Sequence, residues 1–258
     1  WERRNSLPKG APDTSDTAVA RLGQAVSGFF VQAEGRGRLC LVEHFSRNET
    51  LDYYFAYLSD YPDTTVTWND TEQLVREKRR HAFEVVYAFD RSAGILDIYA
   101  RGGRKVVRPL QELFADAILG VTLDRGDQGG HPYRVEGLKH RGFAFPTDPE
   151  DGIAEVAVRR MRLAVAGNPR KQFTVSLPDN GAPDAMYDSL EREINQENMP
   201  LALLRVVRAT ITMKLAGRKR VRRLTFEVGP RSCNLKGQCE ELRELGEKYL
   251  RRWGIEAA

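Results

Sequence analysis

Two hairpins, in which apolar residues alternate on both sides of a turn, constrain the fold more than any other feature of this sequence. Such alternation predicts strands with one buried face, and a turn between two of them predicts an antiparallel pair. The first hairpin turns at residues 91–94. Because the apolar faces of the two strands must match, the register pairs Tyr87 with Ile98 and sets Glu84 opposite Arg101.

The second hairpin spans residues 204–228. Matching its apolar faces pairs Ile211 with Leu224 on the inner side. The same register sets Arg208 opposite Glu227 on the outer side, which is a favourable cross-strand charge pair. Both registers therefore bring opposite charges together.

The rest of the chain adds further strands and a few amphipathic helices. We expect strands at 29–33, 39–45, 53–58, 153–165 and 172–177. We expect helices after a cap at Thr14 or Ser15 and at 109–119, 184–194 and 239–253. Residues 1–13 are rich in turn formers and predict a loose arm. The fold class is thus α+β, built mostly from antiparallel hairpins and meanders.

Length and composition favour two sub-domains. A chain of 258 residues lies between one large domain and two ordinary ones, and residues 121–150 are rich in Gly and Pro. We place the boundary at the end of that stretch, which gives an acidic-to-neutral α+β meander domain at 1–150 and a basic ββα-ββα domain at 151–258. The first carries 20 Lys and Arg against 22 Asp and Glu, or −2, and the second 20 against 14, or +6.

Several classes of protein are disfavoured. No apolar run approaches the roughly 18 residues that cross a bilayer, and the first thirty residues lack the pattern of a secretory signal. Because the chain begins with Trp1 rather than Met, we expect that some sequence precedes it. The three cysteines, Cys40, Cys233 and Cys239, have no CxxC spacing or nearby His, so we expect reduced thiols, a cytoplasmic location, and neither a metal nor a cofactor.

Two windows without any acidic residue, at 156–178 and 198–226, carry the strongest functional signal. Clustered cations bind nucleic-acid backbones because each neutralised phosphate releases a counterion. The alternative is an ordinary solvated or salt-bridged sheet face. The nucleic-acid-binding residues that we predict are Arg170, Lys171, Lys214, Arg218, Lys219 and Arg223.

A cluster of aromatic residues lies in the acidic half, away from those cations. Alternation buries either Tyr54 or its neighbours Tyr53, Phe55 and Tyr57, and exposes the other set. Core or sheet packing is the ordinary role of such residues, and a platform for stacking bases is the alternative.

No motif compels catalysis. The glycine-bearing loops at 34–38 and 101–105 lack the spacing of a phosphate-binding loop and predict hairpin turns. The catalytic candidates are His44, Glu84 and Asp97, which three-dimensional folding could bring together. The turn expected at 47–50 sets His44 opposite Tyr53.

These observations favour a non-catalytic binding or accessory protein. Its basic C-terminal half would contact the backbone of DNA or RNA, or a nucleic-acid-bearing complex. One alternative is a nuclease-like hydrolase with a carboxylate and histidine site on the N-terminal sheet. The other is a protein-binding subunit of a larger assembly.

Overall fold

The computed structural model describes the whole chain except residues 124–130, 195–198, 217–221 and 257–258. It divides into two compact units, one of Glu2–Gly130 and one of His131–Ala258 together with Trp1. This division lies twenty residues before the expected boundary. The reason is that Tyr133, Val135 and Leu138 are buried in the core of the second unit.

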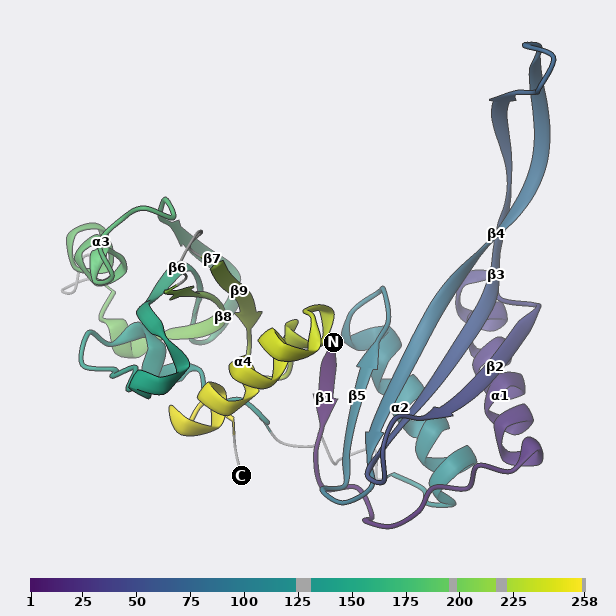
Figure 1. Ribbon diagram of the computed structural model, residues 1–258, viewed down its shortest axis with the longest axis horizontal. Coiled ribbons are helices and arrows are strands. Elements are labelled where there is room, and N and C mark those ends of the chain that lie inside the picture. The colour runs from purple at the N-terminus through teal and green to yellow at the C-terminus, as the bar shows by residue number, and fades with distance from the viewer. Residues whose placement is uncertain (124–130, 195–198, 217–221, 257–258) are drawn as a thin grey trace. The chain divides into compact units, whose positions relative to one another are not determined.

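The first unit is a five-stranded antiparallel sheet in the order β1-β5-β4-β3-β2, covered on one face by two helices (Figure 1). The strands are β1 (Glu2–Arg4), β2 (Cys40–Ser46), β3 (Leu51–Trp68), β4 (Leu74–Asp90) and β5 (Ile95–Tyr99). The helices are α1 (Asp16–Glu34) and α2 (Arg104–Leu119). Helix α2 begins before the expected start at Pro109, and Gly120 ends it in the left-handed conformation, as expected.

Helix α1 includes residues 29–33, which the sequence predicted as a strand. The Ser15 side chain caps it by accepting a hydrogen bond from Ala18 N. Its buried stripe runs through Leu22, Val26 and Phe30 at a spacing of four, which continues the helical period across residues 29–33. The strand prediction for 29–33 was therefore wrong.

The first residues of the chain are not a loose arm either. Strand β1 pairs with β5, and Arg3 forms a two-pronged ion pair with Asp97 at 2.9 and 3.1 Å. A three-residue strand with a charged pair gives no period to detect in the sequence, which explains why this edge was missed.

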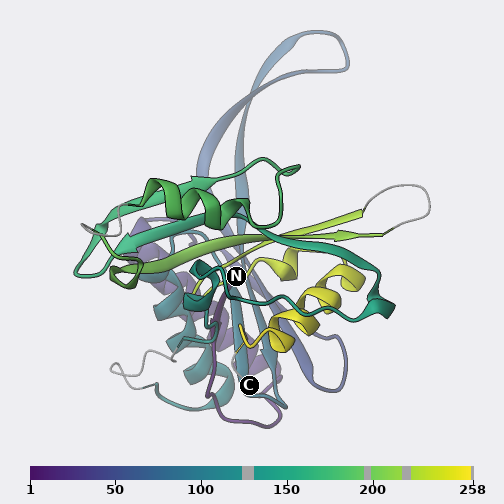
Figure 2. The ribbon, with the colours of Figure 1, turned by 90° about the vertical axis from the view of Figure 1, so that its left-hand side faces the viewer.

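The longest element of the first unit is a hairpin arm made by β3 and β4 (Figures 1 and 2). Strand β2 pairs with β3 only as far as Leu58, and β5 pairs with β4 only from Val86 onward. From Pro62 to Arg80 the two strands therefore pair only with each other, and we call residues 62–80 the arm. A bulge between Ser59 and Pro62 separates the arm from the sheet.

Of the two predicted strand registers, one is confirmed and the other is wrong. In β4–β5 the pairing of Tyr87 with Ile98 is confirmed. In the C-terminal hairpin Ile211 pairs with Phe226 instead of Leu224, a shift of two residues. Alternation fixes which residues share a face but not the register along the strand, so Ile211 and Leu224 lie on the inner side as predicted although they are not partners.

The second unit is a four-stranded antiparallel sheet in the order β7-β6-β8-β9. The strands are β6 (Ile153–Val165), β7 (Asn168–Ser176), β8 (Leu204–Leu215) and β9 (Arg222–Val228), and the helices are α3 (Ala185–Glu193) and α4 (Glu240–Arg252). The predicted ββα-ββα order is confirmed. Side chains of α3, α4 and one sheet face form a single core. The α+β prediction is correct, and no helix in the described residues is long and apolar enough to span a membrane.

Candidate nucleic-acid interface

Four arginines gather on the sheet face of the second unit that points away from its core. Arg160 and Arg162 lie on β6, and Arg205 and Arg208 lie on β8; all four are exposed. They point outward because their neighbours Met161, Leu163, Val206 and Ala209 point into the core. We call these four residues the arginine face.

Strand pairing brings two of these positive charges directly together. Arg162 and Arg208 are cross-strand partners between β6 and β8. Like charges opposite each other destabilise a sheet. Arg208 is partly neutralised by Glu227, at 3.0 Å, which confirms the predicted ion pair between these residues. No such carboxylate serves Arg162 in the part of the chain that the structure describes.

The surroundings of the arginine face suit an anion. Arg160 donates a hydrogen bond to the Ser176 hydroxyl at 3.2 Å, and Thr174 lies beside Arg162 on β7. Among the described residues, no carboxylate lies within ion-pair distance of Arg160, Arg162 or Arg205. Guanidinium groups present forked donors that match phosphate oxygens, and the nearby hydroxyls supply further donors.

Two of the predicted binding residues are occupied by acids of their own unit. Lys214 lies 2.8 Å from Glu155. Arg223 lies 3.4 Å from Asp179. The acid-free window 198–226 hid these contacts, because both carboxylates come from outside it. Neither cation is left unpaired for a ligand.

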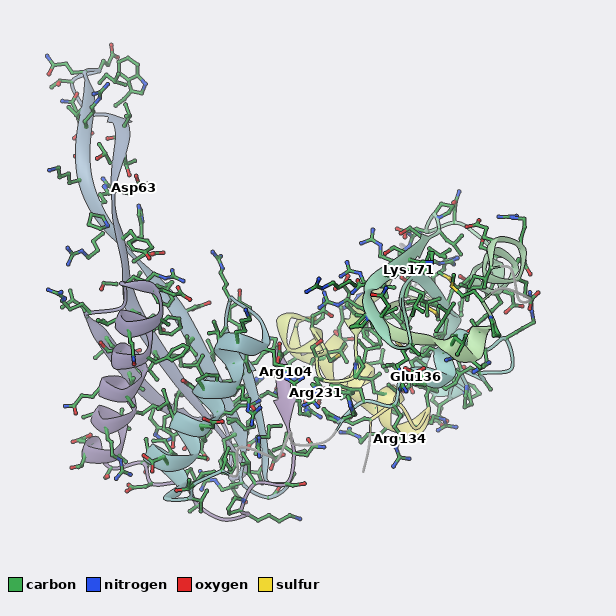
Figure 3. The ribbon with its side chains drawn as sticks, turned by 180° about the vertical axis from the view of Figure 1, so that it is seen from behind. Asp63, Arg104, Arg134, Glu136, Lys171 and Arg231 are labelled. Carbon is green, nitrogen blue, oxygen red and sulfur yellow. The ribbon has the colours of Figure 1, made fainter. Side chains whose placement is uncertain are left out.

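The other predicted binding residues divide into two groups. Arg170 and Lys171 are exposed on the edge strand β7, and Lys171 is labelled in Figure 3. The Lys171 ammonium lies 5.9 Å from the centre of the Phe173 ring. Arg218 and Lys219 lie outside the described residues. The structure therefore leaves Arg170 and Lys171 exposed, on the strand that pairs with β6 of the arginine face.

Sequence reasoning passed over the arginine face although its signal was present. Arg160 and Arg162 lie two residues apart in the acid-free window 156–178, separated by the apolar Met161. On a strand this spacing puts both cations on one face. What the sequence did not show is that β8 lies beside β6 and adds its own arginines.

The histidine candidate belongs to a buried carboxylate network. His44 pairs with Tyr54 rather than Tyr53, so the predicted register was wrong by one residue. The turn is wider than expected, because the Asn48 side chain accepts hydrogen bonds from the amides of Thr50 and Leu51. A shift of one turns His44 toward the helices.

The centre of this network is Asp52, whose side chain is fully buried. It accepts hydrogen bonds from Ser46 at 2.7 Å and from Arg91 at 2.6 Å, and His44 Nε2 lies 3.0 Å from it. Burial alone would raise the pKa of Asp52, but the hydrogen bonds and the positive charge of Arg91 hold it below its ordinary value. The hydrogen bond from Ser46 and the ion pair with Arg91 therefore compensate the buried negative charge of Asp52.

The three catalytic candidates do not meet. His44 faces the helices, whereas Glu84 and Asp97 lie on the opposite sheet face. Asp97 is ion-paired with Arg3, and Glu84 lines a hollow of about 610 Å³ beside Tyr57 and His81. Within the described ranges, no group of three His, Cys, Asp or Glu side chains is placed to hold a metal ion.

Of the two predicted arrangements of the β3 aromatic residues, the structure has the one that buries Tyr54. Tyr54 is fully buried under the helices, and Tyr53, Phe55 and Tyr57 line the opposite face, with ring centres 5.9 and 6.4 Å apart. Strand β2 adds exposed side chains to it, and β4 adds one more. We call these residues the aromatic face: Leu41, Glu43, Phe45, Tyr53, Phe55, Tyr57 and Glu84.

Comparisons of the chain with protein-family models, with curated proteins and with solved structures find no match.

Proposed function

We propose that the protein is an accessory binding protein whose second unit contacts the sugar-phosphate backbone of a nucleic acid through its arginine face. Arg170 and Lys171, at the edge of the same sheet, extend the contact. Binding of this kind reads charge and spacing rather than base sequence.

The pairing of Arg162 with Arg208 carries the proposal. Two guanidinium groups on directly opposite residues repel each other in the free protein. A phosphate between them turns this repulsion into two charge-assisted contacts, so the arrangement favours an anion. The excess of +6 in residues 151–258 adds a long-range attraction for a polyanion.

The spacing of the cations on the arginine face favours a backbone ligand over an isolated anion. Cross-strand neighbours in a sheet lie about 5 Å apart, and residues two apart along a strand lie about 7 Å apart. Successive phosphates on a nucleic-acid strand have a spacing of the same order. The arginine face thus offers several cations in a row, as a polymer requires.

The direct test is the double variant Arg160→Glu, Arg162→Glu in the full chain. Its binding to single-stranded and double-stranded DNA and to RNA is measured by fluorescence anisotropy over a range of salt concentrations. We expect weaker binding to all sequences. On duplex DNA, the slope of log affinity against log salt should fall by about 0.9 for each phosphate that the variant no longer neutralises.

The matched control makes the same change in charge elsewhere. Arg192 and Arg251 are exposed on the helices that cover the opposite face of the sheet. The variant Arg192→Glu, Arg251→Glu should therefore keep most of the affinity. Equal decreases in both variants would show that only net charge matters, and wild-type protein that does not bind nucleic acid at low salt would refute the proposal.

A further inference from the structure

The two faces of the arm differ in chemistry. One face carries Asp63, Thr65, Thr67, Val75, Glu77 and Arg79. There Arg79 and Glu77 form an ion pair at 2.7 Å. The other face contains no acidic residue and consists of Pro62, Thr64, Val66, Trp68, Leu74, Arg76, Lys78 and Arg80. We call the second set the basic arm face.

The basic arm face has no partner within the described part of the chain. Trp68, Leu74 and Val66 are 71%, 58% and 51% exposed. Arg76, Lys78 and Arg80 are exposed and form no ion pair with any described residue. The turn at 69–73 is well formed, since the Asn69 side chain accepts hydrogen bonds from the amides of Thr71 and Gln73.

An isolated two-stranded ribbon is marginally stable in water, and large exposed apolar side chains mark interaction sites. Together these two principles predict that a partner covers the arm when the protein functions. Nucleic acid is the weaker choice, because the turn at the tip carries Asp70 and Glu72, and residues 62–80 have four acids against four bases.

The aromatic face has the opposite charge. Leu41 and Phe45 are 59% and 60% exposed. Glu43 and Glu84 are exposed, and neither forms an ion pair with a described residue. One face therefore combines apolar groups with two unpaired acids, and the other combines apolar groups with three unpaired bases.

The two faces also lie on the same side of β3 and β4. Along β4 the even-numbered residues run without interruption from Arg76 through Glu84 to Ala88, so by alternation they share a side. On β3 the bulge between Ser59 and Pro62 moves the shared side from odd-numbered to even-numbered residues. One ribbon thus has an acidic aromatic end and a basic apolar end on the same side.

We propose that two copies of this chain associate through a two-fold axis near the bulge, with the basic arm face of each copy on the aromatic face of the other. A two-fold interface must be self-complementary, and a surface with opposite charges at its two ends satisfies that condition when two copies align antiparallel.

Counting residues along the strands supports this arrangement. An axis near Asp60 brings Trp68 of one copy level with Tyr53 of the other, and Lys78 level with Tyr57 and Glu84. Arg76 then lies level with Phe55 and its cross-strand neighbour Glu43. The step of two residues from Arg76 to Lys78, about 7 Å, equals the step from Phe55 to Tyr57.

The test exchanges the charges. Variant one is Arg76→Glu, Lys78→Glu, Arg80→Glu, and variant two is Glu43→Lys, Glu84→Lys. Light scattering coupled to size exclusion measures the mass of each full-length protein over a range of concentrations. We expect wild type to approach twice the 29.2 kDa of one chain as concentration rises. Each variant alone should stay at 29.2 kDa.

Mixing the two variants decides between this proposal and a loss of folding. In the mixture each reversed arm meets a reversed face and each original arm an original face, so the dimer should form again. Combining all five changes in one chain should restore self-association too. Monomeric wild type, or a mixture that remains monomeric while both variants show native circular dichroism, would overturn the proposal.

Two further outcomes would overturn it in favour of another occupant. If variant one loses nucleic-acid affinity without any change in mass, the arm binds nucleic acid. If the wild-type mass is doubled but neither variant changes it, the interface lies elsewhere. Both results are distinct from those expected for the arginine face, whose variants should alter affinity and leave the mass unchanged.

Discussion

At the scale of single residues, Asp52 shows how this fold accommodates a buried charge. Its carboxylate is enclosed by the sheet and the helices, yet it has hydrogen-bonding partners on β2 and in the turn after β4. Removing one partner of a buried ion pair leaves the other charge uncompensated, and this costs more than the pair itself contributes.

We therefore expect Asp52→Asn to lower the free energy of unfolding by roughly 3 kcal/mol at neutral pH. The folded-state pKa of Asp52 lies below its ordinary value of 3.8, so its contribution is fully present above 3.8 and is lost as the pH falls through the folded pKa. The difference between wild type and variant should shrink in that range. Urea denaturation at neutral pH and at several pH values below 3.8 measures it.

The control for this change is Asp70→Asn, which removes an exposed carboxylate at the tip of the arm. It should leave the free energy of unfolding nearly unchanged. If Asp52→Asn were equally neutral at all pH values, the network around Asp52 would not contribute to stability.

Single residues were also where prediction from the sequence was least secure. His44 was paired with Tyr53 instead of Tyr54 because one additional turn residue, stabilised by Asn48, reverses the side of every residue on β2 relative to β3. Alternation alone gave two choices for Tyr54, and it could not decide which face the helices would cover. Such choices depend on contacts between elements rather than on any local pattern.

At the scale of elements, the start of α1 offers a direct test of local chemistry. The sequence allowed either Thr14 or Ser15 as the cap, and the structure uses Ser15, whose hydroxyl lies 3.3 Å from the Ala18 amide. The amide would otherwise lack a partner in the first helical turn.

We expect Ser15→Ala to destabilise the protein by about 1 kcal/mol, the usual cost of losing such a cap. The matched control is Thr14→Ala, one residue earlier, which should have little effect. Thermal unfolding and urea denaturation of both variants measure the difference. The reverse order of effects would mean that Thr14 is the cap in solution.

Elements that bury one face were predictable, and those that bury none were not. The hairpins of both sheets have alternating apolar residues because one side of each meets a core. The arm has solvent on both sides, and threonines lie on both of its faces, so Val66 and Trp68 do not mark a buried face in the sequence. Residues 29–33 failed for another reason, since two aromatics and a valine favour strands locally although the helical stripe continues through Phe30.

At the scale of the whole molecule, the chain contains two cores that share no residue. One core is formed around the helices of the first unit, and the other around α3 and α4 in the second. A domain with its own hydrophobic core folds on its own in principle.

We expect residues 131–258, produced alone, to unfold cooperatively and to bind nucleic acid with an affinity close to that of the full chain. Residues 2–130 should fold without binding appreciably. Urea denaturation followed by far-ultraviolet circular dichroism, together with anisotropy at matched salt, measures both properties. Binding that needs both units, or that segregates with residues 2–130, would contradict the assignment of the arginine face.

The net charge of each half of the chain could be predicted from the sequence, but the cations that remain unpaired for a ligand could not. The excess of positive charge in the second half is visible in composition, yet Lys214 is ion-paired with Glu155, and Arg223 with Asp179. Ion pairs between distant residues follow from the tertiary fold, so counting charges overestimates the number that face a ligand. Prediction of the arginine face also requires the order of the strands in the sheet.

The bulge between Ser59 and Pro62 gives β3 one residue more than β4 where the arm leaves the sheet. Directly opposed residues of a ribbon share a side, so the pairing of Val66 with Arg76 keeps both on the basic arm face whatever the length of the bulge. A deletion of one residue within the bulge would restore regular pairing and leave that face as it is. A change of length in the turn at 69–73 that shifted the register by one would instead bring the acidic and threonine side of β3 beside the cations of β4. In the divergence of such a chain, the length of the turn is therefore a stricter requirement than the length of the bulge.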